Sequence, residues 1–386
     1  MVNDSNSVER CSTVQHGAEQ RSAVHSAEQR SAVHSAEQRS AVRRDAKYLL
    51  AYLLPAAAFA GLYFRGVWSP GSFYLAFVVI PLLELVIPPA TENLPETEEN
   101  QLAKSRFFDY LLYLNAPVLY GLLYYFATIL NSGVALSGFE LVGLTLNLGI
   151  MAGAIGINVA HELGHRPGRF DQLMARILLL PSLYLHFNIE HNRGHHKHVA
   201  TDADPASARK GENIYAFWWR SVSGSYVNAW RIEAERLRKL ELPIWSWHNE
   251  MLQFQVIQIL WLGGIAFFFG WTVMLFAVLV AMGGVLLLES VNYIEHYGLR
   301  RRLQASGRYE PVSPRHSWNS DHQLGRIFLY ELTRHSDHHY KASRKYQVLR
   351  HMEESPQLPV GYPASIVLSL APPLWFRMMD QRVPEE

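Results

Sequence analysis

Histidine is the residue type whose number and spacing stand out, because the chain of 386 residues contains 18 of them. Ten of the histidines lie in three clusters and one further stretch. The clusters read HELGH at 161–165, EHNRGHHKH at 190–198 and RHSDHH at 334–339, and the stretch NYIEHYGL at 292–299 carries one more histidine. Two histidines four positions apart share one face of a helix, so both rings can bind one metal ion. The clusters therefore predict metal chelation.

Nine of these ten imidazoles are candidate ligands. One ion usually accepts only about four to six donors. Two ions are therefore expected, and imidazole suits iron, zinc and copper. A single cluster is compatible with different chemistry, since HELGH is also a zinc-peptidase motif with Glu162 as general base, and a lone histidine is commonly structural. These alternatives do not account for all four stretches. The candidate ligands are His161, His165, His191, His195, His196, His296, His335, His338 and His339.

Carboxylates are expected around these ligands, because neutral imidazoles leave the charge of two divalent ions uncompensated and need a partner for the second ring N–H. The candidates are acids adjacent to a candidate ligand. Neighbouring residues of a helix point about 100° apart, so each acid should serve another cluster than its own. The alternative is a solvated or salt-bridged acid. The candidates are Glu162, Glu190, Glu295 and Asp337. Among the remaining histidines, which we expect to be structural or surface groups, His198 and His322 are considered for a similar supporting role.

Six apolar stretches are long enough to cross a bilayer as helices, which takes about 20 residues. They are 47–66, 72–90, 107–130, 134–160, 251–270 and 272–290. Arg43, Arg44 and Lys47 precede the first stretch, and positive charge stays in the cytoplasm. Six crossings then bring the polar segments 91–106, 161–250 and 291–386 to the cytoplasmic side. All histidine clusters therefore meet on one side of the membrane.

The first 45 residues form a separate tail with a nine-residue repeat, seen as HSAEQRSAV at 25–33 and again at 34–42. The repeat produces no apolar stripe, so we expect the tail to be disordered or loosely helical. No secretory signal is visible there. A formal net charge of +1 gives no indication of nucleic-acid binding, and the single cysteine, Cys11, excludes a disulfide within the chain and four-cysteine metal sites.

Three glycines of the fourth apolar stretch lie one above the other, shortly before HELGH. Such a groove could leave a slot through which a hydrocarbon chain reaches the metal site. The alternative, which the pattern favours, is close helix packing, because small residues at such spacings let membrane helices approach each other. The glycines are Gly149, Gly153 and Gly156.

The motifs as a whole resemble those of the membrane alkane 1-monooxygenases, also called alkane omega-hydroxylases. HELGHR, EHNRGHHKH, NYIEHYGL and RHSDHHYKASRKYQVL carry this resemblance, which covers residues 47–375. The histidine boxes alone are shared with fatty-acid desaturases and membrane hydroxylases. NYIEHYGL narrows the match to the alkane and xylene monooxygenases, and Arg344, Tyr346, Gln347 and Leu349 point to the alkane enzymes.

The resemblance implies an all-α integral membrane protein, a bundle of six transmembrane helices with a cytoplasmic, histidine-rich catalytic cap, in the bacterial inner membrane. Helices at 46–160 and 251–290 would then carry the catalytic segments 161–250 and 291–386. It implies that the nine histidines bind two non-haem iron ions, and that dioxygen is the co-substrate for hydroxylating the terminal carbon of medium- or long-chain alkanes that dissolve in the membrane lipid.

The same resemblance implies rubredoxin as electron donor, itself reduced by an NADH-dependent rubredoxin reductase. This sequence contains no CxxC, so the donor is another polypeptide or a part of the native chain outside this sequence. Because rubredoxins are usually acidic, we expect a basic cytoplasmic patch to receive it. Lipid-headgroup contacts or structural ion pairs are the alternative for each residue. The candidates are Arg166, Arg169, Arg193, Lys197, Arg344 and Lys345.

Rival hypotheses from the sequence differ in the metal or in the substrate. A histidine-box fatty-acid desaturase or xylene-type methyl hydroxylase shares the metal site and differs in its pocket. An intramembrane zinc peptidase needs one zinc ion at HELGH and leaves the other clusters unexplained. A metal transporter needs ionisable groups along a path through the spans, where Glu84, Glu140 and Glu289 are almost the only ones.

Overall fold

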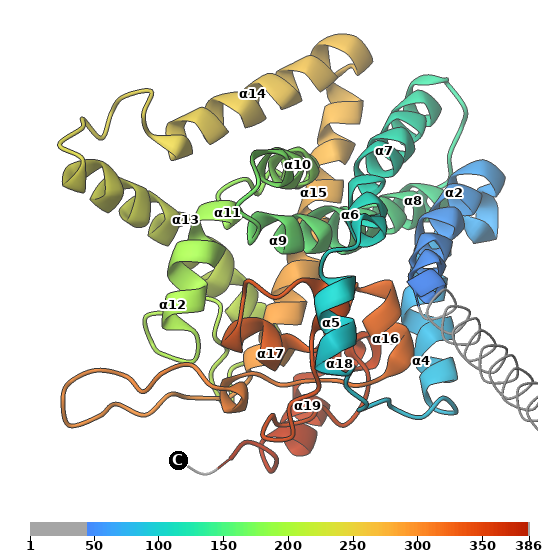
Figure 1. Ribbon diagram of the computed structural model, residues 1–386. Helices are drawn as coiled ribbons and strands as arrows, with labels where there is room; N and C mark the ends of the chain where they lie inside the picture. The colour runs from blue at the N-terminus through green and yellow to red at the C-terminus, as the bar shows by residue number, and fades with distance from the viewer. Residues whose placement is uncertain (1–44, 385–386) are drawn as a thin grey trace, which may run out of the picture. The chain divides into compact units, whose positions relative to one another are not determined.

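The computed structural model describes residues 45–384, and this part of the chain is helical, without a β-strand (Figure 1). It divides into Met1–Leu49 and Leu50–Glu386, and the second unit contains the whole site. Five helical stretches are long and apolar enough to cross a membrane: Lys47–Phe64, Arg106–Asn131, Gly138–Gly164, Glu250–Phe269 and Trp271–His296. The described part of the chain is thus all-α, and its long apolar helices indicate a membrane protein. The predicted N-terminal tail lies outside the described residues except for its last position.

The long stretches include several shorter helical elements joined end to end. They are η1 (Lys47–Tyr52) with α2 (Leu53–Phe64), α6 (Arg106–Tyr113) with α7 (Asn115–Asn131), α8 (Gly138–Met151) with the π-helical η4 (Ala152–Ile157) and α9 (Asn158–Gly164), α14 (Glu250–Phe269), and α15 (Trp271–His296). The observed stretches Gly138–Gly164 and Trp271–His296 continue past the predicted ends of these spans at 160 and 290. The helices themselves therefore hold His161 and His296 in place.

The second predicted span, 72–90, is shorter in the structure. Its helical part consists of α3 (Gly71–Tyr74), the π-helical η3 (Leu75–Val79) and α4 (Ile80–Glu84), which together are too short to count among the five. The reason is tertiary: the backbone after Glu84 pairs with a later segment. Ala90 N–H donates to Asp321 O at 3.0 Å, and Arg326 Nη1 donates to Ala90 O at 2.6 Å. Backbone groups satisfied in this way no longer need a helix.

The remaining elements are short and lie between or after the long helices. Before α14 they are η2 (Gly66–Trp68), α5 (Glu96–Leu102), α10 (Arg169–Leu179), η5 (Leu180–Ser182), α11 (Phe187–Glu190), the π-helical η6 (His191–His195), α12 (His196–His198) and the long α13 (Ile214–Lys239). After α15 they are η7 (Pro314–His316), α16 (Gln323–Phe328), α17 (His335–Tyr340), η8 (Tyr346–Val348), α18 (Tyr362–Ser369) and α19 (Pro372–Met379). In Figure 1, α17 and α18 lie beside the C-terminal end of α15.

α8 packs against α15. The stretch that begins with α8 continues into α9, which contains His161, and α15 ends at His296. A Cβ added at Gly149 would lie 3.1 Å from Gly283 Cα, so the helices meet backbone to backbone. Such small-residue contacts let membrane helices pack closely. A capping box of Ser137 and Glu140 fixes the beginning of α8, because each side chain satisfies a backbone N–H of the other.

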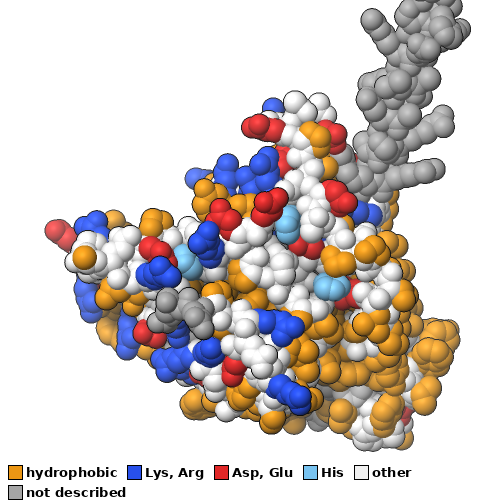
Figure 2. Space-filling view, turned by 90° about the horizontal axis from the view of Figure 1, so that it is seen from below, with side chains coloured by type: hydrophobic (Ala, Val, Ile, Leu, Met, Phe, Trp, Pro, Cys, Tyr) orange, Lys and Arg blue, Asp and Glu red, His pale blue; other side chains and the backbone are white. Residues whose placement is uncertain are grey.

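The surface separates apolar from charged side chains. On α14, Phe267 and Phe268 are 83% and 74% exposed, as expected of side chains that face lipid. Figure 2 looks onto the side of the short helices, where Lys, Arg, Asp and Glu side chains gather, whereas hydrophobic side chains dominate at its edge. The short helices on this side therefore present a charged surface, and the histidine clusters lie on short helices and on the ends of the long ones.

Candidate metal centre

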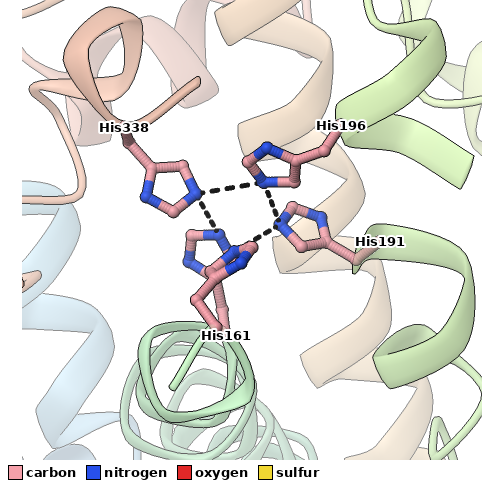
Figure 3. Close-up of side chains that lie close together, drawn as sticks. His161, His191, His196 and His338 are labelled. Carbon is pink, nitrogen blue, oxygen red and sulfur yellow. Dashed lines mark hydrogen bonds between the residues drawn. The ribbon is translucent and has the colours of Figure 1, made fainter. Parts of the chain in front are cut away.

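Five histidine rings converge between α9, α12, η6 and α17, and we call them the five-histidine group. Their Nε2 atoms are 2.9 Å apart for His161 and His338, and 3.2 Å apart for His338 and His196. The chain of contacts continues from His196 to His191 at 3.0 Å and from His191 to His165 at 3.2 Å. Figure 3 shows four of these rings with their nitrogen atoms directed toward one another. The ligand atoms of all five lie within 4.8 Å of one another.

Four further rings form a second cluster, the four-histidine group. His195 Nε2 lies 3.2 Å from His339 Nε2, which lies 2.8 Å from His335 Nε2. The last residue of α15, His296, completes the group, with its Nε2 3.2 Å from that of His335. All four residues are buried. The nine predicted histidines are thus brought together, five in one group and four in the other.

The second histidine cluster is divided between the groups in a way that helical spacing alone does not predict. An α-helix would place His191 and His195 on one face, but η6 is a π-helix, in which residues five positions apart align. His191 therefore meets His196, and His195 turns to the four-histidine group. In the third cluster, His335 and His339 are four apart and stay together, while His338 joins the five-histidine group. The two clusters bridge both groups.

Most of the rings outside the membrane-spanning helices have the protonation state that metal binding requires. Burial, with a smaller contribution from neighbouring His195, lowers the pKa of His165 to about 4. Burial likewise holds the pKa values of His191, His338 and His339 well below the ordinary value. These four imidazoles are then neutral and offer a lone pair. The pKa of His195 is raised instead, because the effect of Asp204 outweighs that of burial. Two nitrogens that bind one ion at about 2.1 Å and at right angles lie about 3.0 Å apart, which matches the observed spacings. Each group can therefore hold a metal ion.

Carboxylates contact the four-histidine group on two sides. Asp204 Oδ2 lies 2.9 Å from His195 Nδ1, the ring nitrogen that faces away from the group. This contact selects the tautomer in which Nδ1–H donates to Asp204 and Nε2 keeps its lone pair. Glu295 Oε2 lies 3.2 Å from His335 Nε2, and the other oxygen accepts the Tyr362 hydroxyl at 2.9 Å. Glu295 thus adds an oxygen on the metal side of the group.

An apolar cavity reaches both groups from the membrane-spanning helices. Its wall includes His161 and His191 of the five-histidine group and His335 of the four-histidine group. The rest of the wall is mostly aliphatic and aromatic, with Asn158, Asn292 and Glu295 as its main other polar residues. An apolar molecule in this cavity would end beside both groups.

Known proteins are similar to this chain in sequence. A family model described as fatty acid desaturase matches residues 137–366. An alkane 1-monooxygenase of Pseudomonas aeruginosa is 41% identical over 327 residues, which cover 82% of this chain and 87% of that protein. One of Pseudomonas putida is 40% identical, covering 87% of this chain and 84% of its own length. The chain belongs to the alkane 1-monooxygenase family.

This assignment confirms the resemblance that the four motifs indicate. The family lies within the broader fatty acid desaturase family, and a more distant relative is the hydroxylase component of a xylene/toluene monooxygenase of Pseudomonas putida. That protein is 29% identical over 343 residues, covering 86% of this chain and 87% of its own length. The histidine groups fit the metal site of a histidine-box family.

Three of the four predicted acids do not contact a histidine ring of this alkane 1-monooxygenase homologue. Glu162 accepts Arg166 Nη2–H at 2.9 Å, and Asp337 pairs with Arg344 at 2.6 Å. Glu190 accepts the side-chain amide of Asn228 at 3.1 Å. These acids hold the framework of the site in place. Asp204, which does orient a ring, is not adjacent to a histidine in the sequence, so the adjacency criterion does not find it.

The predicted basic residues fall into three sets, which differ in burial. Arg166 is buried among Glu162, Asp109 and Asp171, so the expectation that it receives a partner is wrong. Its guanidinium compensates acids inside the fold. Arg344 and Lys345 are half-buried and paired with Asp337 and Asp109. The exposed ones are Arg169, Arg193 and Lys197, of which Arg193 pairs with Glu233 and Glu250.

The three glycines have different surroundings. Gly153 lines the cavity. Gly149 packs against Gly283, and a Cβ at Gly156 would meet Leu119 and the Leu178 carbonyl at 3.3 Å. For these two the packing interpretation holds. His198 and His322 belong to neither histidine group: the His322 ring contacts Ser320 Oγ at 2.9 Å, and the His198 carbonyl accepts the Thr201 hydroxyl at 2.7 Å.

Proposed function

We propose that this protein hydroxylates the terminal carbon of medium- or long-chain n-alkanes to primary alcohols, using dioxygen and electrons from rubredoxin at a di-iron site held by the nine histidines. The apolar cavity carries this proposal, because its wall contains histidines of both groups. A hydrocarbon in the cavity presents its end to the metal site and has no polar group by which it could be held elsewhere. The relatives named alkane 1-monooxygenase support the same activity.

The five-histidine group offers five donors, and the four-histidine group offers five once Glu295 is included. Imidazole together with carboxylate suits iron. The bound iron pair supplies the activation of dioxygen that an unactivated C–H bond requires. The reaction consumes the alkane, dioxygen, two electrons and two protons, and yields the alcohol and water. The chain itself contributes an enclosed apolar wall, which keeps bulk water from the reacting carbon. Asp204 holds the His195 ring in its binding tautomer.

The depth of the cavity favours chains of medium length. Its wall extends along one continuous helix from Ile150 to His161, and eleven steps of about 1.5 Å span about 16 Å. An extended hydrocarbon advances about 1.25 Å per bond of about 1.5 Å, so about thirteen to fourteen carbons fill this length. Gly153 and the small side chain of Ala154 line this path.

The proposed location is the bacterial inner membrane, with six crossings and the metal site on the cytoplasmic side. The sixth crossing is the shorter apolar segment Gly71–Glu84, which the chain completes with the paired backbone that follows it. Basic residues before the first span support the orientation. In a Cys11→Ser background, single cysteines placed at exposed Asn100 and Arg308 should react with a membrane-impermeant reagent only from the cytoplasmic side.

The proposed electron donor is rubredoxin, itself reduced by an NADH-dependent reductase. A basic groove between α12 and α13 supports a docking place for such an acidic protein. The groove includes Arg193, Lys197, Arg231, Arg236 and Lys239. It also includes Gly194, the residue before His195. Gly194 and Lys197 of the groove are neighbours in the chain of His195 and His196, which belong to different histidine groups. A donor bound in the groove would therefore contact residues next to ligands of both groups. Opposite charges across an interface raise the rate of encounter.

Purified full-length protein in detergent tests the proposal, with iron, rubredoxin, its reductase, NADH and dodecane supplied. About two irons per chain and formation of 1-dodecanol are expected, with no alcohol from the His335→Ala variant. Two irons with no alcohol, but with a hydroxylated xylene or a desaturated acyl chain, would assign the site to a different substrate. One zinc and no iron would contradict the metal site.

A cavity variant tests the substrate class. Ala154→Phe fills part of the cavity beside the histidines, so conversion should shift from dodecane to shorter alkanes. Ala127→Phe is the matched control, because Ala127 lines a different apolar groove, between α7, α14 and α15. An unchanged chain-length profile in Ala154→Phe, in protein that retains two irons, would contradict binding of the alkane in this cavity.

A further inference from the structure

A further apolar groove, distinct from the one between α7, α14 and α15, lies on the other side of α15 from the apolar cavity that reaches the histidine groups. It runs between α13, α15 and the segment after η5, and its wall includes Leu183, Tyr184, Trp218, Ala281, Val285 and Leu286. The next two residues of α15, Leu287 and Leu288, line the cavity instead. The helix is thus a partition between the two spaces, and the groove itself contains no histidine of either group.

A buried polar chain crosses this partition. Asn292 lines the cavity, and its side-chain amide donates to Glu289 Oε2 at 3.3 Å. Glu289 Oε1 accepts the hydroxyl of Tyr184, which lines the groove, at 2.9 Å. All three residues are buried, and Glu289 is 1% exposed. An ionisable group inside a membrane-spanning helix is costly and calls for a function. Neither metal binding nor the framework of the histidine groups uses this carboxylate.

An unpaired polar atom lies next to the same chain. The His186 ring centroid is 4.3 Å from that of Tyr184, and the ring is buried. Its Nε2 has no hydrogen-bond partner in the described part of the protein. Such an atom costs free energy unless a ligand or water satisfies it. A small hydroxyl group at this place could accept or donate the missing hydrogen bond, since a neutral imidazole does both.

The outer part of the groove suits an amphipathic molecule. Tyr215 and Trp219, which line it, are 52% and 80% exposed. Tyrosine and tryptophan concentrate where membrane meets water, because each ring has an apolar body and a polar edge. A long-chain primary alcohol has the same two-part character. An alkane does not, and it would gain nothing from polar groups in the wall.

We propose that this groove receives the primary alcohol product, and that Asn292, Glu289 and Tyr184 form the polar gate through which its hydroxyl group passes from the cavity. This inference rests on the proposed function. The gate distinguishes product from substrate by the one group in which they differ, because only the alcohol can replace a hydrogen bond that it breaks. Substrate is retained beside the histidines, and product is drawn to the rim.

The apolar groove between α7, α14 and α15 provides the internal comparison. It also contains a tyrosine, Tyr120, but that hydroxyl donates to the Ile177 carbonyl at 2.9 Å. Among the described residues, no acid lines this groove. It contains no buried carboxylate–tyrosine pair like that of Glu289 and Tyr184, so it should favour the alcohol over the alkane less than the groove beside α13 does.

Photolabelling of metal-free, full-length protein tests the binding site without any turnover. The probes are 1-dodecanol with a diazirine beside its hydroxyl end and the same diazirine hydrocarbon without the hydroxyl. The alcohol should label residues 215–222 and 278–286 at least about threefold more than the hydrocarbon does, and Tyr184→Phe should abolish this preference. Tyr120→Phe should retain it. Equal labelling by both probes would overturn the proposal, and labelling as expected in an inactive enzyme would separate it from the proposed hydroxylation.

Transient kinetics test the gate in the active, two-iron protein. Tyr184→Phe should form the first equivalent of alcohol at the wild-type rate and then turn over about three- to tenfold more slowly, because product release loses a hydrogen bond. Val222→Phe, which narrows the groove while leaving the polar chain intact, should show the same burst and slow release. Leu123→Phe in the comparison groove should show neither. If the first and later turnovers slow equally in both groove variants, the groove is no release path.

Discussion

The two histidine groups differ in burial and in charge, although they offer similar numbers of donors. The four-histidine group is fully buried and has Glu295 on its metal side and Asp204 behind His195. In the five-histidine group, His165 and His196 are half-buried, and the nearest predicted acid, Glu162, is paired with Arg166. A divalent ion is costly to bury unless carboxylates compensate it. Carboxylates would therefore compensate the charge of an ion in the four-histidine group, and an ion in the five-histidine group would lack such a neighbour among the predicted acids.

Removing one ring from each group has the largest expected effect. His335→Ala and His165→Ala should both reduce alkane hydroxylation more than about 100-fold, since losing a ligand costs at least as much as losing its supporting contact. Iron content separates them. Each variant should retain about one iron, but the ion that remains should be accessible to chelators in His335→Ala and protected in His165→Ala. Loss of both ions in both variants would show that the groups do not bind independently.

Asp204→Asn should weaken the four-histidine group without removing a ligand. The amide cannot accept the Nδ1–H of His195 as a carboxylate does, so we expect iron affinity at this group to fall about 10- to 100-fold. Titration of metal-free protein with iron(II) measures this fall. Asp202→Asn is the matched control, because its carboxylate is 76% exposed and pairs with Arg300 at the surface. Equal affinities in the two variants would mean that Asp204 does not support a ligand.

Chelation kinetics should separate the groups in the unmodified protein. A water-soluble iron(II) chelator should remove one ion per chain faster than the other, because His165 and His196 are partly accessible and the four-histidine group is buried. Asp204→Asn should accelerate the slow phase and leave the fast phase unchanged. A single phase that removes both ions would remove the basis for treating the groups as unequal.

The identity of the candidate ligands could be predicted from the sequence, because nine histidines at helical spacings leave few alternatives. Their division between the groups could not. The π-helical turn at His191–His195 changes the alignment by one residue, and no residue type in that turn indicates it. Asp204 could not be predicted either, because its contact with His195 depends on the turn that follows α12, and the sequence does not distinguish it from Asp202 in the same turn.

The long helices were likewise predictable, because apolar stretches of about 20 residues have few other solutions. The early end of the second span was not. It depends on hydrogen bonds from Ala90 to Asp321 and Arg326, more than 200 positions away in the chain. Local hydrophobicity extends to Ile87 and contains no information on these partners. Predictions therefore succeed where the cause is local and fail where a distant segment satisfies the backbone.

The smallest expected effect concerns the surface beside both groups. Lys197 is exposed and immediately follows His196 of the five-histidine group. Lys197→Glu should raise the KM for rubredoxin about two- to fivefold at low salt, with iron content and single-turnover chemistry unchanged, because charges at the rim of an interface act mainly on encounter. Arg308→Glu, an exposed reversal in the loop between α15 and η7, is the matched control. High salt should diminish the difference between the variants. If Arg308→Glu has the larger effect, electrons enter from the side of that loop, and the accessibility of the five-histidine group has another purpose than electron transfer.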